Sequence, residues 1–294
     1  MVYKFKAYGR KRKKGGKQVM FEKFENRVII SGILETKTGL HIGSAYAHGS
    51  ADTDSPVIKD VDEKPIIPGS SFKGVLRSVV EKIVSGLGLD CCYITNQEGN
   101  CLSANNELKQ KEFEEAKKAF TNPGEEEEYM ESLICDVCKL FGSTYISSRV
   151  FIKDLRYKEG NANYSVRDGV AIDRDSETAG DKLKYDFEVV PPNVKFEFEA
   201  IAENISLRLL GLLFIGLKQF ESPNSVIIGG MKSRGLGWVN LKLNQIEVVD
   251  SKGDLLNEED AKLKSYLINN RGHIISEETG IQAFINKAVR SFLS

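Results

Sequence analysis

The pattern of hydrophobic and polar positions divides the first part of the chain into strand and helix periodicity. Residues 21–42 are rich in Val and Ile and predict one long strand or a strand pair that ends near Gly39. After a turn at 65–69, apolar residues recur every three or four positions, which predicts a helix that Ser70 caps. The apolar face of this helix consists of Phe72, Val75, Leu76, Val79, Val80, Ile83 and Leu87.

The second half of the chain shows the same alternation. Residues 147–157 predict a strand, and in residues 194–204 apolar and charged residues first alternate strictly, as in a half-buried strand. Residues 206–220 are apolar on nearly every side of a helix, so we expect this helix to be buried. A further strand at 238–249 and an amphipathic helix at 281–293 follow.

The order of these elements is β-α-β-β-α-β, with an insertion after the first helix. This order predicts an α+β fold with a ferredoxin-like core of the RRM type, whose open sheet often serves nucleic acids. The polar, Gly- and Asp-rich residues 167–192 predict an exposed hairpin within that core. We therefore expect a basic tail, a core in two segments, an insertion and a C-terminal helical extension: 1–20, 21–85 with 139–250, 86–138, and 251–294.

The insertion contains every cysteine of the chain, namely Cys91, Cys92, Cys101, Cys135 and Cys138. Cys135 and Cys138 have the spacing of a zinc knuckle, and the other three offer two further ligands for a tetrahedral site. Because adjacent cysteines rarely bind one ion together, we expect four of the five to hold a structural Zn²⁺. Buried free thiols and disulfides are the alternatives, and a redox pair lacks a thioredoxin-like context.

A structural metal would explain how the insertion folds. It has about 50 mostly polar residues around a Lys- and Glu-rich helix at 107–120, too few apolar groups for a core of its own.

The net charge of −1 argues against a nucleic-acid-binding protein, but the charges are segregated. Residues 1–20 carry eight Lys or Arg and no acid, whereas residues 125–128 are four consecutive Glu. Such asymmetry fits a basic face for a polyanion, or simply a solvated tail. The longest apolar run, 209–217, has nine residues, and a bilayer span needs about 18. We expect a soluble cytoplasmic protein without a membrane partner.

Two glycine-rich turns are candidate phosphate sites. The first, Gly69-Ser70-Ser71, opens the predicted helix, where backbone N–H groups and the helix dipole favour anions. Lys73 and Arg77 follow it, and an ordinary helix cap is an equal alternative. The second turn consists of Gly229, Gly230, Lys232, Ser233, Arg234 and Gly235. We favour RNA there, over a plain turn before a strand, because its glycines permit close approach and two basic residues lie at its tip.

The polar loop 42–56 carries Asp52, Asp54 and His48, and His41 precedes it. Taken alone, Asp54 is most simply a turn residue before Pro56. A pair of imidazoles, His41 and His48, could serve a metal-free ribonuclease, although a histidine at a strand end is more often structural. We expect His273 to be a surface residue.

Five segments in this order carry a family resemblance: TGLHIGSAYAHGSADTDSPVIKD (38–60), IPGSSFKGVLRS (67–78), CDVCKLFGS (135–143), DRDSETAGDKLKYDFEVVPP (173–192) and GGMKSRGLGW (229–238). Together they resemble the RAMP superfamily, the RNA-binding proteins of CRISPR systems, over roughly residues 25–245. Within it they are most similar to the backbone subunit of type III, Csm-like effector complexes.

The resemblance implies a subunit that polymerises along a guide crRNA with copies of itself and other type III effector subunits. Residues 167–192 would be a thumb hairpin that kinks the guide–target duplex, and the paired single-stranded target RNA would be cut once. In the family pattern the Asp before Ser-Pro cleaves RNA, which here is Asp54. It would assist attack of the target's 2′-OH on the adjacent phosphate with Mg²⁺ or Mn²⁺.

The turns and the resemblance together imply a set of RNA-binding residues: His41, Gly69, Ser70, Ser71, Lys73, Arg77, Arg167, Arg174, Gly229, Gly230, Lys232, Ser233, Arg234 and Gly235. Two alternatives have the same fold. One is a scaffold subunit that binds RNA without cleaving it. The other is a ribonuclease that processes guide precursors through His41 or His48, from which the Asp-Ser-Pro and Cys-x-x-Cys-x-Leu-Phe-Gly elements point away.

Overall fold

A large antiparallel sheet, backed by helices on one face, forms the centre of the structure, a computed structural model. The structure describes residues 23–44, 53–92, 101–103, 107–121, 123–172, 179–222, 226–256 and 263–294. The predictions for the basic tail (1–20), His48, Asp52 and Arg174 lie outside these residues.

The seven strands of this sheet run in the order β2-β4-β7-β1-β8-β9, and β3 also pairs with β7. Their bounds are Asn26–Thr36 (β1), Ile66–Ile67 (β2), Val150–Ile152 (β3), Leu155–Glu159 (β4), Lys195–Glu203 (β7), Val239–Asp250 (β8) and His273–Ile275 (β9). β1 lies between β7 and β8 and pairs with both in antiparallel register, with a bulge at Ser31 and Gly32 on the β8 side. Strands that are far apart in the sequence, such as β1 and β8, are therefore adjacent in the sheet.

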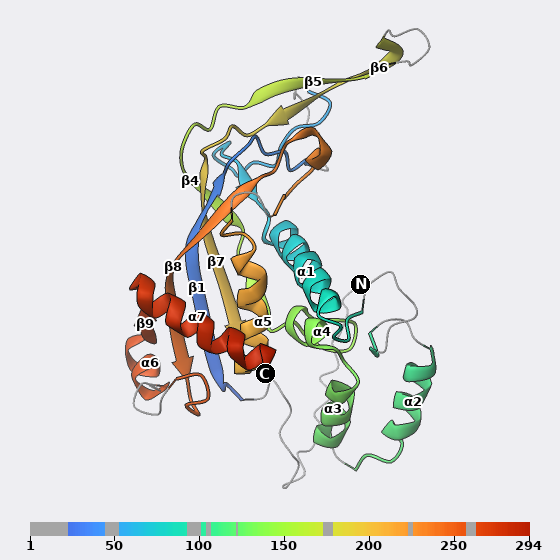
Figure 1. The fold of residues 1–294 in the computed structure, drawn as a ribbon, viewed down its shortest axis with the longest axis vertical. Coiled ribbons are helices and arrows are strands. Elements are labelled where there is room, and N and C mark those ends of the chain that lie inside the picture. Colours follow the sequence, from blue (N-terminus) through green and yellow to red (C-terminus); the bar gives the residue numbers. More distant parts are fainter. Residues whose placement is uncertain are drawn as a thin grey trace, which may run out of the picture.

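The alternation of β1 and β7 determines which face of the sheet is buried. Along β7, Phe196 and Phe198 are buried and Glu197 is exposed, as the period of two predicted. The buried face is covered by α1 (Gly69–Gly86), α5 (Leu207–Lys218) and, beside α5, α7 (Glu278–Leu293) (Figure 1). Since α5 contacts a helix on each side, its nearly continuous apolar surface is buried, as expected.

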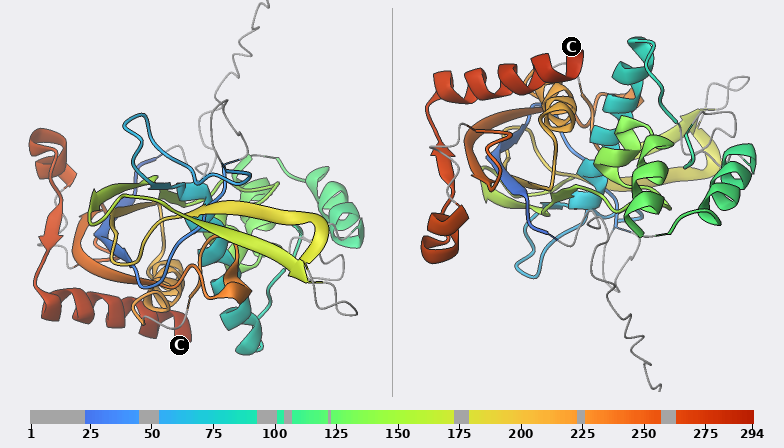
Figure 2. Two further views of the ribbon diagram at one scale, coloured as in Figure 1. Left: turned by 90° about the horizontal axis from the view of Figure 1, so that it is seen from above. Right: turned by 90° about the horizontal axis from the view of Figure 1, so that it is seen from below.

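In the described part of the insertion and the residues directly after it, three helices lie on one side of the core: α2 (Glu107–Lys117), α3 (Pro123–Ser132) and α4 (Asp136–Phe141). α4 contacts both α1 and α5, which joins the insertion to the core. The C-terminal elements α6 (Leu263–Asn269) and β9 lie on the opposite side (Figure 1 and Figure 2).

A second sheet consists of the hairpin β5 (Ser165–Ile172) and β6 (Ala179–Val189), which projects from one end of the molecule (Figure 1). The hairpin expected at 167–192 overlaps these two strands. Within the described residues, no helix is long and apolar enough to cross a bilayer.

Two local predictions were wrong. The segment 147–157 forms two strands, β3 and β4, instead of one. Ser70 does not cap α1: the helix begins at Gly69, and Asp154 Oδ1 accepts the Gly69 N–H at 2.8 Å.

The four Glu at 125–128 lie in α3. Glu125 and Glu126 occupy its first turn, where the helix dipole favours acidic side chains.

Candidate functional site

Asp54 is an exposed residue that is held against the stem of the hairpin. Its backbone N–H donates to Asp186 Oδ1 at 2.6 Å, and the Asp186 N–H donates to Asp54 Oδ2 at 3.1 Å. The next residue, Ser55, forms a parallel bridge with Phe187, and its carbonyl accepts the Glu188 N–H at 3.0 Å. The Asp54 segment therefore lies along β6 like a short additional strand.

His41 is buried beneath this segment, with 5% of its surface exposed. Its Nδ1 lies 2.7 Å from the Glu188 carbonyl oxygen and must therefore donate to it, while Nε2 lies 3.4 Å from Ser55 Oγ. The ring also packs edge-on against Phe187. These contacts favour the structural interpretation of His41, because both ring nitrogens face the protein.

The second glycine-rich turn packs against the same histidine. Gly230 N–H donates to the His41 carbonyl at 2.8 Å, and a Cβ at Gly229 would lie only 2.3 Å from that oxygen. Gly229 also has φ +80, a conformation that side chains disfavour. These two glycines thus serve close packing within the protein, whereas Gly235 faces open space and leaves room for a ligand.

Between Gly230 and Gly235, the three residues of a 3₁₀ turn, Lys232–Arg234, are exposed. The Arg234 guanidinium hydrogen-bonds the Tyr185 hydroxyl and lies 5.6 Å from the centre of its ring. Leu236 packs with Phe187 in a small apolar cluster. The turn and Asp54 are therefore anchored on the same four residues of β6, 185–188, which we name the hairpin stem.

Arg167 also belongs to this region. It is exposed on β5 and faces Phe187 of the hairpin stem across the ladder. The structure thus brings together Asp54, Arg167 and the turn at 229–235. Tyr185 and Asp186 of the hairpin stem were not among the residues predicted from the sequence. The alternation of polar and apolar residues at 184–189 was the signal that could have identified them as part of a strand.

The first glycine-rich turn does not form an open anion site of the kind expected. A Cβ at Gly69 would lie 2.2 Å from the Ile152 carbonyl oxygen, so this glycine is needed for packing. The Gly69 N–H already has the Asp154 carboxylate as its partner. Ser70 is exposed and Ser71 half-buried at the start of α1.

Lys73 and Arg77 use their donors within the protein. Lys73 Nζ donates to Ser148 Oγ at 2.7 Å and to the Val150 carbonyl at 2.9 Å, and burial, with Arg77 nearby, lowers its pKa. Arg77 forms an ion pair with Glu81 at 2.8 Å and donates to the Gly142 carbonyl at 2.9 Å. These contacts do not support the predicted role of the two residues as phosphate ligands.

The Arg77–Glu81 pair leads to a prediction for stability. Because Glu81 is buried, we expect Arg77→Leu to leave a carboxylate without its partner and to lower the free energy of unfolding by about 3 kcal/mol. The double variant Arg77→Leu, Glu81→Leu should recover most of this loss. Denaturant unfolding of the three variants measures it, and a double variant no more stable than the single one would contradict the pairing.

Four cysteine sulfurs of the insertion lie close together beside α1 and the start of α4. The Sγ atoms of Cys92, Cys101, Cys135 and Cys138 all lie within 4.8 Å of one another, and all four residues are buried. Sulfurs at about 2.3 Å from a tetrahedral ion lie roughly 3.8 Å apart, so the cluster could hold a metal ion after small adjustments. Arg77 Nη2 lies 3.5 Å from Cys138 Sγ and would offset the negative charge of such a centre.

The remaining cysteine, Cys91, lies outside this four-thiol cluster. Burial raises its pKa to about 12, which keeps it a neutral thiol. Within the cluster, hydrogen bonds from Cys135, Cys138 and Cys92 lower the pKa of Cys101. Hydrogen bonds with Cys101 and Cys135 raise the pKa of Cys92 and Cys138, so Cys101 loses its proton more readily than these two thiols.

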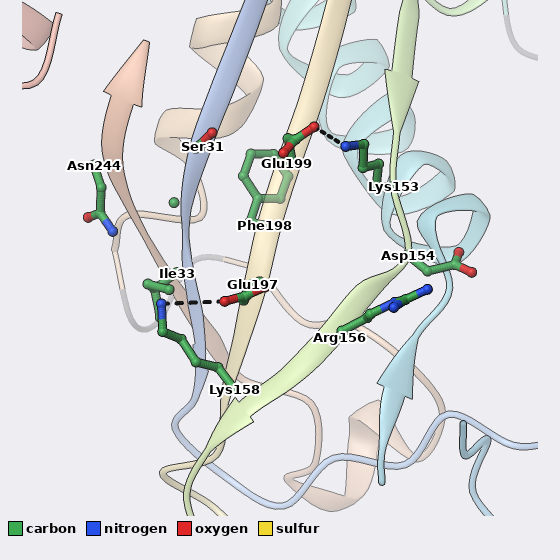
Figure 3. Close-up of a pocket in the computed structure, with 11 residues that line it drawn as sticks. Ser31, Ile33, Lys153, Asp154, Arg156, Lys158, Glu197, Phe198, Glu199 and Asn244 are labelled. Carbon is green, nitrogen blue, oxygen red and sulfur yellow. Dashed lines mark ion pairs between the residues drawn. The ribbon is translucent and has the colours of Figure 1, made fainter. Parts of the chain in front are cut away.

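The open face of the sheet carries a groove of about 750 Å³ between β1, β4, β7 and β8 (Figure 3). Two ion pairs cross it, Lys153 with Glu199 and Lys158 with Glu197 at 3.5 Å. The only aromatic residue in its lining, Phe198, has its side chain buried in the core. Among the residues that line the groove, none therefore provides an exposed aromatic ring for base stacking, the mode common in RRM sheets.

Comparison with known proteins identifies the class of this protein. The sequence model described as the RAMP superfamily matches residues 33–240, well over half of the chain, so the chain belongs to the RAMP superfamily.

Three curated relatives are each named CRISPR system Cms endoribonuclease Csm3. The protein of Methanocaldococcus jannaschii is 42% identical over 59 residues, which cover 20% of this chain and 24% of the relative. The protein of Streptococcus thermophilus is 44% identical over 59 residues (19% and 27%). That of Methanothermobacter thermautotrophicus is 44% identical over 61 residues (20% and 25%). The chain thus matches about a quarter of the length of these relatives.

Proposed function

We propose that this protein is the guide-RNA-binding backbone subunit of a type III CRISPR effector complex, and that it cleaves the paired target RNA with Asp54. The single observation that carries the proposal is the position of Asp54, an exposed carboxylate anchored to the same hairpin stem as the basic turn at 229–235. The names of the relatives, which include an endoribonuclease activity, support it.

The core is a ferredoxin-like fold in this proposal. The strands β4, β7, β1 and β8 stand in the order second, third, first and fourth, with α1 following β1 and α5 following β7. This order matches the β-α-β-β-α-β arrangement of a ferredoxin-like core, which supports the proposal. The hairpin β5–β6 is the proposed thumb, residues 86–138 form the insertion and residues 251–294 the C-terminal extension.

In this proposal, guide phosphates are bound by the turn at 229–235. Lys232, Ser233 and Arg234 are exposed on the turn, and Gly235 has no neighbour where a Cβ would be. Arg167 adds a further positive charge from β5. Contacts of this kind read the phosphate backbone and suit a guide of arbitrary sequence. Ser70, Ser71 and Arg174 remain predictions as RNA contacts.

The chemistry assigned to Asp54 is proton or metal handling at the reacting phosphate. Asp54 Oδ2 accepts the Asp186 N–H, and Oδ1 is left to face the RNA. A hydrated Mg²⁺ or Mn²⁺ at this carboxylate would supply charge neutralisation at the phosphate. One carboxylate is a small catalytic apparatus, so the kinked target RNA itself must bring its 2′-OH into line. The buried position of His41 speaks against processing of guide precursors by a pair of imidazoles.

The four-thiol cluster holds a structural Zn²⁺ in this proposal. The ligands are Cys92, Cys101, Cys135 and Cys138, a complete tetrahedral set that leaves no position for water. The ion would join the insertion to α1, which supplies Arg77 to the same cluster. A closed site of this kind supports folding and takes no part in catalysis.

The experiment that tests the proposed function is recovery of the native complex and sequencing of its RNA. We expect uniform short RNAs that share a repeat-derived tag, together with other effector subunits and several copies of this chain. Random cellular RNA, or none, would contradict the proposal.

A second prediction concerns the basic turn. We expect Lys232→Ala to weaken binding of guide RNA about fivefold for every sequence and to lower the slope of log affinity against log salt by about 1, as for the loss of one phosphate contact. Lys82→Ala, an exposed lysine near the far end of α1, is the matched control and should change neither quantity. Equal effects of the two changes would show that the turn has no special role.

A further inference from the structure

We propose that Asp186 is a positioning residue that holds Asp54 in register with the hairpin stem. The inference rests on the proposed function of Asp54 and assigns a role to a residue of β6 that the sequence did not single out.

The two aspartates hold each other through both backbone and side chain. Asp186 Oδ1 accepts the Asp54 N–H at 2.6 Å, which fixes the backbone of Asp54. In return the Asp186 N–H donates to Asp54 Oδ2 at 3.1 Å, which fixes the side chain. Among the described residues no donor contacts Asp54 Oδ1, so the clamp selects which oxygen is presented to a ligand.

The clamp is the first of a run of contacts along the hairpin stem. After it come the Ser55–Phe187 bridge and the bond from the Val57 N–H to Glu188 Oε2 at 3.0 Å. Lys59 Nζ adds an ion pair with Glu188 at 3.2 Å. Residues 55–59 are thus held by several contacts. Among the described residues, Asp186 is the one that hydrogen-bonds the exposed side chain of Asp54. Loss of the Asp186 carboxylate should free the backbone of Asp54, and with it the position of the Asp54 carboxylate, without unfolding the segment.

The clamp has a mechanical consequence because Asp186 lies on β6. The same strand forms one arm of the projecting hairpin (Figure 1). Any displacement of the hairpin stem moves the acceptor of the Asp54 N–H and therefore moves Asp54. In the proposed function the hairpin kinks the duplex, so the clamp would align the carboxylate with the distortion that the hairpin produces.

Asp186 acts here as an acceptor and not through its charge, which separates positioning from metal binding. Asn at 186 keeps a carbonyl oxygen for the Asp54 N–H but has no negative charge. Ala at 186 removes the acceptor and leaves the backbone N–H in place. Asp186→Asn and Asp186→Ala therefore form a diagnostic pair.

The experiment measures single-turnover cleavage of target RNA by complexes assembled with each variant. We expect Asp186→Ala to slow cleavage roughly 10- to 100-fold, as for a misplaced catalytic group, and Asp186→Asn to stay within about threefold of the unchanged chain. RNA affinity and the Mg²⁺ concentration for half-maximal rate should not change in either variant. Asp168→Asn, which removes the same charge from the facing position of β5, is the control and should cleave normally.

Three results would overturn the role assigned to Asp186. One is an unchanged rate for Asp186→Ala. Another is a loss in Asp186→Asn as large as in Asp186→Ala with a higher Mg²⁺ requirement, which would make Asp186 a charged metal ligand. The last is an equal loss in the Asp168→Asn control.

A measurement that does not depend on activity separates this inference from the proposed function. Hydrogen exchange of the peptide 53–58 should become faster in Asp186→Ala and stay slow in Asp186→Asn. Unchanged exchange in Asp186→Ala would exclude the clamp even if Asp54 proves catalytic. Faster exchange together with intact cleavage by Asp54→Ala would keep the clamp and reject the proposed function.

Discussion

Replacement of Asp54 by Ala should abolish cleavage of the target RNA while the complex still assembles and binds RNA. We expect the single-turnover rate to fall about 10²- to 10⁴-fold, the range for loss of a group that handles a proton or a metal at the reacting atoms. RNA affinity should stay the same because Asp54 carries a negative charge and makes no attractive contact with phosphate. Cleavage of a labelled target by purified complexes measures the rate, and filter binding measures the affinity.

Asp62→Ala is the matched control for this prediction. Asp62 is an exposed acid in the turn that follows the same segment, and its backbone N–H, not its carboxylate, takes part in the turn through Asp60. Its removal should leave cleavage unchanged. An unaltered cleavage pattern in Asp54→Ala would favour the scaffold alternative, in which a neighbouring subunit cuts the RNA.

Removal of one cluster thiol should release the metal and destabilise the insertion. We expect Cys135→Ser to lower zinc from about one ion per chain to near zero, since a closed tetrahedral site needs its four ligands. Structural zinc contributes of order 10 kcal/mol to small domains, so even partial loss should lower the melting temperature by roughly 10 °C and expose the insertion to protease. Metal analysis, thermal unfolding and limited proteolysis measure the three effects.

Cys91→Ser is the control, because Cys91 is adjacent to a ligand but lies outside the four-thiol cluster. This variant should keep its zinc and its melting temperature. Clearly substoichiometric zinc in gently purified unchanged protein would count against the site. Equal loss of metal from the two variants would show that the ligand set is assigned wrongly.

The sequence predicted most elements of the core because their burial patterns are local. The alternation along β7 and the apolar surface of α5 are visible in the residues themselves, and the structure confirms both. The two unpredicted elements of the C-terminal part, α6 and β9, are short, with seven and three residues. Elements of that length carry too few periodic positions to be recognised.

The candidate site was only partly predictable, since the same residue type can serve packing or binding. Gly229 was a candidate for RNA contact, but a Cβ there would collide with the His41 carbonyl oxygen. Arg77 was a candidate phosphate ligand, but it lies between Glu81 and Cys138. Which partner a side chain meets depends on segments that are distant in the sequence.

By itself the sequence determined the order of strands and helices, the thiols of the insertion and the resemblance that singles out Asp54, since each depends on residue types at set spacings. Only the tertiary structure decided that Cys92, and not Cys91, joins the four-thiol cluster, and that Asp186 meets Asp54 from 132 residues away. The reason is physical: a hydrogen bond or a ligand set requires atoms within a few ångströms. The pairing of the hairpin stem with the 54–57 segment brings Asp186 to Asp54, and the packing of the insertion brings the four thiols together.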